Sequence, residues 1–186
     1  GVLAIIITIM VLEFKTPHES DWSVLRELYP NFLSYALSFV YIGIYWGNHH
    51  HLLHTCENID AGIIWANMNL LFWLSLVPFA TGWMGENHFA TNTVVLYALL
   101  LLICGVAFTI LQVRIQRINR NNPKLLHAFE RVKRKGIISV VCYFLAIPFA
   151  YYNTLISGLL FVVVAISWFI PDRNIERALG IGRKPE

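Results

Sequence analysis

The sequence has few charged residues for its length of 186. Asp, Glu, Lys and Arg make up 13% of it and apolar residues 57%, whereas a soluble domain carries about 25% charged residues. A domain that meets water on every side is therefore excluded. The composition predicts an all-α, polytopic integral membrane protein, and no stretch of the chain is left over for a soluble domain.

Motifs of several chemical classes are also absent. The three cysteines, Cys56, Cys104 and Cys142, form no Cys-x-x-Cys pair, so neither a disulfide framework nor a zinc knuckle is indicated. The sequence has no His-Glu-x-x-His, Gly-x-Gly-Asp or Ser/Lys pattern of an intramembrane enzyme. No carboxylate lies in the middle of an apolar run. We therefore expect no enzyme, no carboxylate-based proton pump, no metal and no cofactor.

Six apolar segments reach, or nearly reach, the ~20 residues that a membrane crossing requires. Two of them share the run Ile137–Pro171, which as one helix would be roughly 50 Å long at about 1.5 Å per residue. Pro148, Asn153 and Gly158 lie near its centre, so we expect two helices with a tight turn between them. The chain is then one six-helix domain, 1–186, with spans at roughly 1–14, 32–53, 63–83, 93–113, 136–151 and 154–170.

Basic residues are distributed unevenly between the two sides that six spans define. Only Lys15 and Arg26 lie on one side, and twelve lie on the side of the termini. Because Lys and Arg favour the cytoplasmic side, both termini are expected in the cytoplasm. The longest basic link, Arg114–Lys135, is better explained by contact with the lipid bilayer than by nucleic acid, which is not expected as a partner.

A histidine cluster lies in "YWGNHHHLLH", Tyr45–His54. His50 and His54 are four residues apart on one helical face, a spacing that can bind zinc or clamp a haem. Packing and hydrogen bonding to neighbouring helices is the favoured interpretation, because no further ligand motif accompanies the cluster. A proton- or ion-coupled secondary transporter that uses the His49–His54 cluster, together with the polar Asn67, is the alternative function.

The segment Gly1–Phe14 contains an apolar stripe. Ile5, Ile9 and Leu12 recur at i, i+4 and i+7, and Thr8 lies beside them. Any helix that faces lipid or a protein core has such stripes. A stripe that faces a symmetry axis would instead form rings of a narrow hydrophobic pore that gates by dewetting. Spacing alone favours the first interpretation.

Several stretches resemble the transmembrane protein 175 family, the endosomal and lysosomal potassium channels and their bacterial relatives. "GVLAIIITIMVLEF" at Gly1–Phe14 is similar to the segment after the family's Arg-x-x-x-Phe-Ser-Asp signature, which we expect just before Gly1. "WGNHHHLL" at Trp46–Leu53 resembles its Trp-x-x-His motif, and Asn58–Asp60 and Asn67–Thr81 also match. Over the last three segments, only hydropathy and charge layout match. The chain is identified as a prokaryotic member.

The resemblance implies a homotetramer in the bacterial plasma (inner) membrane that conducts potassium ions, with the first helix of each subunit lining the pore. The constriction would fall on Ile5, with further apolar rings at Ile9 and Leu12, and Thr8 matches a pore threonine that aids selectivity. Because the sequence has no Thr-Val-Gly-Tyr-Gly filter, selection must come from side chains. A modest preference for potassium over sodium is expected.

The resemblance further implies a structural polar cluster of Trp46, His49 and Asn67. This cluster would brace the base of the first helix.

Overall fold

The computed structural model describes residues 1–14, 16–17, 21–56, 59–118 and 123–169, and within these ranges the secondary structure is entirely α-helical. The all-α class predicted from the sequence is thereby confirmed. The helices are α1 (Val2–Leu12), α2 (Val24–Glu27), α3 (Tyr29–His54), α4 (Ala61–Ser75), α5 (Val77–Glu86), α6 (Thr91–Ile118), α7 (Pro123–Tyr152) and α8 (Thr154–Phe169).

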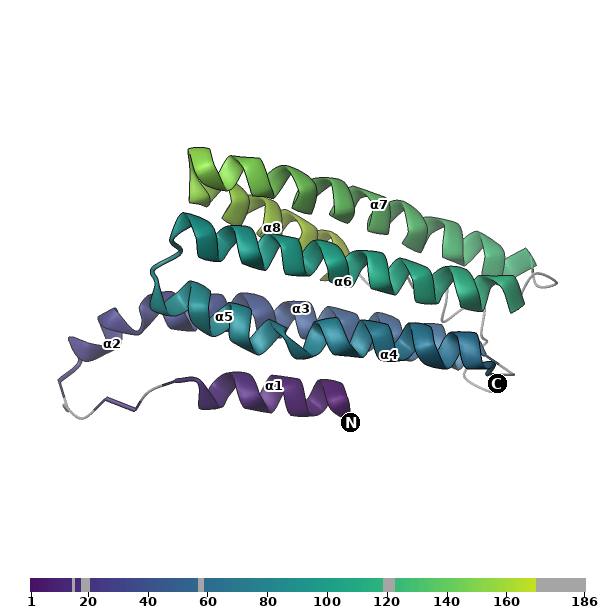
Figure 1. The fold of residues 1–186 in the computed structure, drawn as a ribbon, viewed down its shortest axis with the longest axis horizontal. Coiled ribbons are helices and arrows are strands. Elements are labelled where there is room, and N and C mark those ends of the chain that lie inside the picture. Colours follow the sequence, from purple (N-terminus) through teal and green to yellow (C-terminus); the bar gives the residue numbers. More distant parts are fainter. Residues whose placement is uncertain (15, 18–20, 57–58, 119–122, 170–186) are drawn as a thin grey trace, which may run out of the picture.

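The long helices lie side by side in a bundle (Figure 1). At one edge, α1 packs against α3, α4 and α5. At the centre, α6 packs against α4 and α5 on one side and against α7 on the other, and α8 packs against α7 and α3. One side of α1 is thus covered by the bundle, and its other side is left open.

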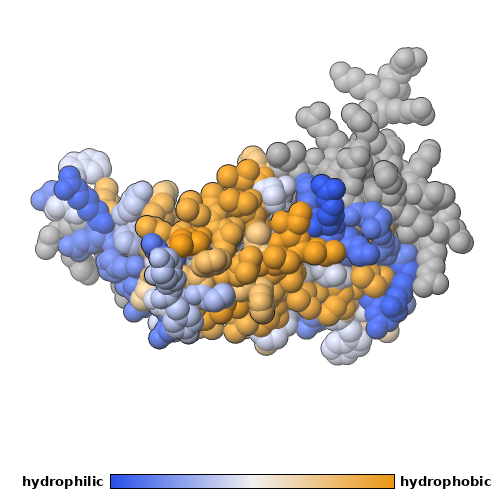
Figure 2. Space-filling model, turned by 90° about the horizontal axis from the view of Figure 1, so that it is seen from above, coloured by the Kyte–Doolittle hydropathy of each residue, from blue (hydrophilic) through white to orange (hydrophobic). Residues whose placement is uncertain are grey.

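Three stretches are long and apolar enough to cross a membrane: Ala61–Glu86, which joins α4 and α5, Thr91–Ile118 and Val132–Tyr152. The apolar helices α1 and α8 are shorter, and α3 contains the polar segment 48–51 in its last two turns. Figure 2 shows a broad apolar surface with hydrophilic residues gathered toward the two ends. The membrane architecture is therefore confirmed, while a crossing by α1, α3 and α8 stays a prediction.

The long run Ile137–Pro171 is divided between α7 and α8 at Asn153. The side chain of Asn153 starts α8, because its Oδ1 accepts a hydrogen bond from the Leu155 amide at 2.9 Å. Pro148 lies inside α7 instead of in the turn, which a membrane helix tolerates when its neighbours satisfy the backbone. Ser157 Oγ then donates to the Ala146 carbonyl at 2.7 Å and fastens α8 to α7.

The third apolar segment is broken between α4 and α5. Pro78 is the second residue of α5 and has no N–H to donate to the carbonyl of Leu74. The start of α4 is capped by Asp60, whose Oδ1 accepts from the Ile63 amide at 2.7 Å. The break places the end of α4 and the start of α5 beside the open edge where α1 lies.

Candidate pore helix and its polar brace

The helix α1 has one buried face and one exposed face. Leu3, Ile6 and Met10 recur at i, i+3 and i+7 and are buried against the bundle. The four residues expected to line a pore are all exposed: Ile5, Thr8, Ile9 and Leu12. Among the three apolar residues of this set, Leu12 is the most open, with 79% of its surface exposed, and Ile5 follows with 58%. Among the residues that the structure describes, no helix covers this face.

The four exposed residues do not point in one direction. Successive residues of an α-helix are about 100° apart, so Thr8 and Leu12 lie opposite the buried face and Ile5 lies next to them. Ile9 is turned by about a quarter of a turn from that direction, toward α5. The sequence predicted that these residues form a single stripe. In the structure they are divided into an outward part, with Ile5, Thr8 and Leu12, and a part that borders α5, with Ile9.

Thr8 uses its hydroxyl hydrogen within its own helix. Its Oγ1 donates to the Ile5 carbonyl at 2.9 Å. The lone pairs of the same oxygen are left for other partners. An exposed threonine oxygen is thereby held at the Ile5 carbonyl, within one helical turn of the residue at which the sequence predicts a constriction.

A groove of ≈ 570 Å³ runs between α1 and the α4–α5 junction. Most of its lining is apolar, and two carboxylates lie among it, Glu13 and Glu86. Glu13 lies against α5, since its Oε2 is 3.6 Å from the position that a Cβ on Gly82 would take. The principal apolar residues are Val2, Ile5 and Ile9 from α1, and Pro78, Phe79 and Trp83 from α5.

The two carboxylates place negative charge at one end of the groove. Glu13 follows the last residue of α1, and Glu86 is the last residue of α5, so both lie where these two helices end. Negative charge raises the local concentration of cations, so cations are favoured at this end of α1 and α5.

A polar contact joins α3 to α4. His49 Nε2 lies 2.6 Å from Asn67 Oδ1, and because an amide oxygen only accepts, the imidazole donates. His49 continues the buried face of α3 that contains Ile42, Tyr45 and Leu52. Two of the three residues expected to cluster are therefore brought together.

Trp46, the third, lies on a different face of α3. It is 56% exposed, and its ring stacks on His50 with the centroids 5.7 Å apart. His50 stacks in turn on His54 at 5.4 Å, which forms a ladder of rings at i, i+4 and i+8. Among the residues that the structure describes, no three His, Cys, Asp or Glu side chains are grouped so as to hold a metal ion.

A buried hydroxyl network was missed by the sequence analysis. Thr81 Oγ1 of α5 lies 2.7 Å from Ser38 Oγ of α3, and the hydroxyls of Ser38 and Tyr97 are 2.8 Å apart. These contacts join α5, α3 and α6, the frame on which α1 rests. The sequence contained one indication of a polar face on α3, because Ser34 and Ser38 are spaced by four within an apolar segment.

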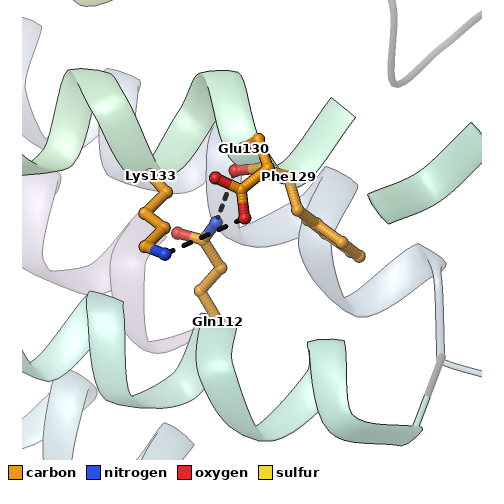
Figure 3. Close-up of polar contacts among 4 residues, drawn as sticks. All are labelled: Gln112, Phe129, Glu130 and Lys133. Atoms are coloured by element: carbon orange, nitrogen blue, oxygen red, sulfur yellow. Dashed lines mark hydrogen bonds and ion pairs between the residues drawn. The ribbon is translucent and has the colours of Figure 1, made fainter. Parts of the chain in front are cut away.

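The far ends of α6 and α7 are joined by a second polar contact (Figure 3). Gln112 Nε2 donates to the Phe129 carbonyl at 3.1 Å, and both side chains are buried. Beside it, Lys133 and Glu130 form an ion pair at 3.8 Å, which contributes little because both side chains are largely exposed. The buried amide is what secures α7 here.

Comparisons with known proteins agree with this arrangement. Residues 1–78 match the family model described as endosomal/lysosomal potassium channel TMEM175. The chain is 48% identical over 179 residues to a potassium channel of Chryseobacterium sp. (strain P1-3), covering 96% of this chain and 93% of that one. It is 35% identical over 92 residues to a potassium channel of Chamaesiphon minutus, covering 46% and 45% of the two chains.

The fold is also similar to a solved structure. The crystal structure of a lysosomal potassium-selective channel TMEM175 homolog from Chamaesiphon minutus aligns with a TM-score of 0.76 and 24% identity, covering 92% of this chain and 93% of that one. Because 92% of this chain is covered, the likeness includes most of the segments in which only hydropathy and charge layout match by sequence.

Proposed function

Because the chain belongs to the TMEM175 family of potassium channels, we propose that it forms a potassium-selective channel whose pore is lined by α1. The observation that carries this proposal is the two-faced character of α1. Leu3, Ile6 and Met10 fasten it to its own subunit, and the opposite face, with Ile5, Thr8 and Leu12, is left open. A conduit needs several such faces around an axis, and we propose four subunits.

The proposed constriction is made of side chains. A ring of Ile5 would force a cation to shed water without replacing it, which makes the ring a hydrophobic gate. The exposed Thr8 oxygen lies one turn further along and supplies the nearest side-chain ligand. Few replacement oxygens imply a modest preference for potassium over sodium, because potassium is the ion that sheds water more easily. Leu12 extends the apolar part of the path toward the end of α1, and Ile9 borders that path from the flank of α1 that is turned toward α5.

We place both termini in the cytoplasm of a bacterial plasma membrane. The basic residues gathered at the ends of α6 and α7, including Arg114, Arg117 and Lys133, support this topology. The carboxylates of Glu13 and Glu86 then lie at the external mouth.

Ion flux through purified protein in liposomes and single-channel recordings in planar bilayers test the proposal. Ile5→Ala is expected to raise conductance and to lower the preference for potassium over sodium, and Thr8→Ala is expected to lower that preference alone. Ile166→Ala is the matched control, because Ile166 on α8 is exposed to the same degree, 60% against 58%, but lies away from the proposed pore. Equal conductance and selectivity in Ile5→Ala, Ile5→Asn and Thr8→Ala would refute the pore assignment.

The same preparation separates a channel from the alternative carrier. A channel passes potassium down its gradient in single-channel steps. A coupled carrier that used the His49–His54 cluster would show saturable flux with a fixed stoichiometry and no such steps.

A further inference from the structure

A small cavity lies between α3, α6, α7 and α8, apart from the groove beside α1. Its volume is ≈ 40 Å³, and because a buried water needs about 10–15 Å³, the cavity has room for roughly three groups of that size. Gly105 of α6 and Gly136 of α7 provide part of this room, since a glycine presents no side chain to the space. The described lining of the cavity includes no residue of α1. The cavity is therefore distinct from the proposed pore.

Aromatic rings make up much of the cavity wall. Tyr41 and Tyr45 come from α3, Phe108 from α6, Tyr143 from α7 and Trp168 from α8. The ring centroids of Tyr45 and Phe108 are 6.0 Å apart, and those of Phe108 and Trp168 are 6.4 Å apart. Several rings around one small space attract an organic cation, and a quaternary ammonium group is the ligand that such aromatic cages recognise.

The polar groups of the wall offer acceptors to a guest. Thr109 Oγ1 donates its hydrogen to the Gly105 carbonyl at 2.8 Å. The Tyr41 hydroxyl donates to a carbonyl of α8 at 2.7 Å, and Asn48 Nδ2 donates to a carbonyl of its own helix at 2.8 Å. The oxygens of these side chains keep lone pairs. Lone pairs and aromatic rings both favour positive charge, so the cavity itself suits a cation better than an anion.

A lysine lies beside the rim of the cavity. Tyr45 and Tyr143 are buried, whereas Gly136 and Trp168 are partly exposed and so mark the rim. Lys135 directly precedes Gly136, and its Nζ lies 5.8 Å from the centroid of the Trp168 ring. A ligand that carried only positive charge would be repelled by this ammonium group, and an acid group on the ligand would be attracted to it.

We propose that the cavity binds a small zwitterion of the betaine class, which carries a trimethylammonium group beside a carboxylate. The trimethylammonium group occupies the aromatic cavity, where its methyl groups match the room available, and the carboxylate meets the Lys135 ammonium. Trp168 Nε1 donates to Ser139 Oγ at 2.7 Å and holds the ring in place for the ligand. A potassium ion does not suit the cavity, because its described lining includes no carboxylate to replace the ion's water.

Isothermal titration calorimetry with glycine betaine tests the site in the full chain, in nanodiscs made of lipids without choline headgroups. We expect saturable binding. The ligand control is 3,3-dimethylbutyrate, which has the same shape and carboxylate but a carbon atom in place of the charged nitrogen, and it should bind at least about tenfold more weakly. Equal binding of the two molecules, or no saturable heat with glycine betaine, would overturn the proposal.

Two variants test the two halves of the site. Gly136→Ala adds a methyl group whose nearest contact is Thr109 Oγ1 at 3.9 Å, so the protein should fold while its affinity for betaine falls about tenfold because the cavity is smaller. Lys135→Gln should weaken the binding of betaine but not that of tetramethylammonium, which has no carboxylate.

Lys133→Gln is the matched control for Lys135→Gln. It removes the same charge from the same helix, but Lys133 is not among the described lining residues and pairs with Glu130. Circular dichroism confirms that each variant is folded. Wild-type affinity in both Gly136→Ala and Lys135→Gln, or an equal loss in Lys133→Gln, would contradict the site.

A last comparison separates a free zwitterion from a lipid headgroup. The phosphocholine headgroup carries the same trimethylammonium group beside a phosphate. Betaine binding that is the same in nanodiscs with and without phosphatidylcholine supports the free zwitterion as the ligand. Loss of betaine binding in the phosphatidylcholine nanodiscs would assign the cavity to the lipid headgroup and overturn the proposal of a free ligand.

Discussion

The imidazole Nε2 of His49 lies 2.6 Å from the amide oxygen of Asn67 and joins the end of α3 to the middle of α4. These residues are separated by 18 positions in the chain, and their helices both pack against α1. The contact is thus part of the frame that holds the proposed pore helix.

Removing either partner is expected to lower the free energy of unfolding. His49→Ala and Asn67→Ala each leave a partly buried polar group without its partner, which costs about 1–3 kcal/mol. The two changes together should cost less than their sum, with a coupling of about 1 kcal/mol. Denaturant unfolding in detergent, followed by circular dichroism, gives the four values of the cycle, and additive values would show that the contact contributes nothing.

Trp46 is expected to be independent of Asn67. Because Trp46 stacks on His50 and lies on another face of α3, Trp46→Ala and Asn67→Ala should add within about 0.5 kcal/mol. The same unfolding measurement checks this. A coupling as large as that of the His49 and Asn67 pair would restore the three-residue cluster predicted from the sequence.

Ser38 is expected to be the most sensitive hydroxyl of the bundle. Ser38→Ala removes the hydroxyl that Thr81 and Tyr97 share. Thr81 keeps its bond to the Val77 carbonyl at 2.7 Å, whereas the buried Tyr97 hydroxyl loses this partner, which costs about 1–3 kcal/mol. Ser75→Ala is the control, because Ser75 is exposed and bonds only to the Phe72 carbonyl of its own helix. It should change stability by less than about 0.5 kcal/mol. Equal melting temperatures of the two variants would contradict the network.

Gly85→Ala is expected to push α5 away from α3. A Cβ at Gly85 would meet Ser34 Oγ at 2.6 Å and the backbone Cα of Asn31 at 2.8 Å, and a backbone atom cannot move aside at small cost. The expected loss is about 1–3 kcal/mol. Gly158→Ala, where nothing lies within 4 Å of the added Cβ, should be neutral or slightly stabilising. Thermal unfolding of the pair measures the difference, and a stable Gly85→Ala protein would contradict the close packing.

The thiol of Cys56, in the connection between α3 and α4, is expected to react slowly near neutral pH. Burial and then the nearby Asp60 carboxylate raise the pKa of Cys56 above its usual value. A raised pKa leaves less thiolate at a given pH, so alkylation by iodoacetamide should be slower at pH 8 than that of an exposed cysteine and should keep rising at higher pH.

Asp60→Asn tests the cause of this effect. It removes the negative charge but keeps an oxygen to accept from the Ile63 amide. The pKa of Cys56 should fall and alkylation at pH 8 should speed up. The pKa should still lie above its usual value, because burial is the larger cause of the shift. The rates are measured with Cys104→Ala and Cys142→Ala in place, and an unchanged rate would exclude the Asp60 contribution.

The sequence by itself determined the class of the protein. A chain with 13% charged residues and long apolar runs has to satisfy its backbone within helices in a membrane. The division of Ile137–Pro171 into two helices also followed from the sequence, since one helix would have been too long for a bilayer and turn-forming residues lie near the centre of the run. The contact of His49 with Asn67 was expected from the resemblance.

The tertiary structure decided which way the helices face. In α1 nearly every residue is apolar, and lipid, core and pore wall favour apolar side chains alike, so periodicity cannot select among them. Only packing against α3, α4 and α5 shows that Leu3, Ile6 and Met10 are covered and that Ile5, Thr8 and Leu12 are open. For the same reason the turn of Ile9 toward α5 could not be read from spacing, because it depends on a neighbouring helix that the fold brings near.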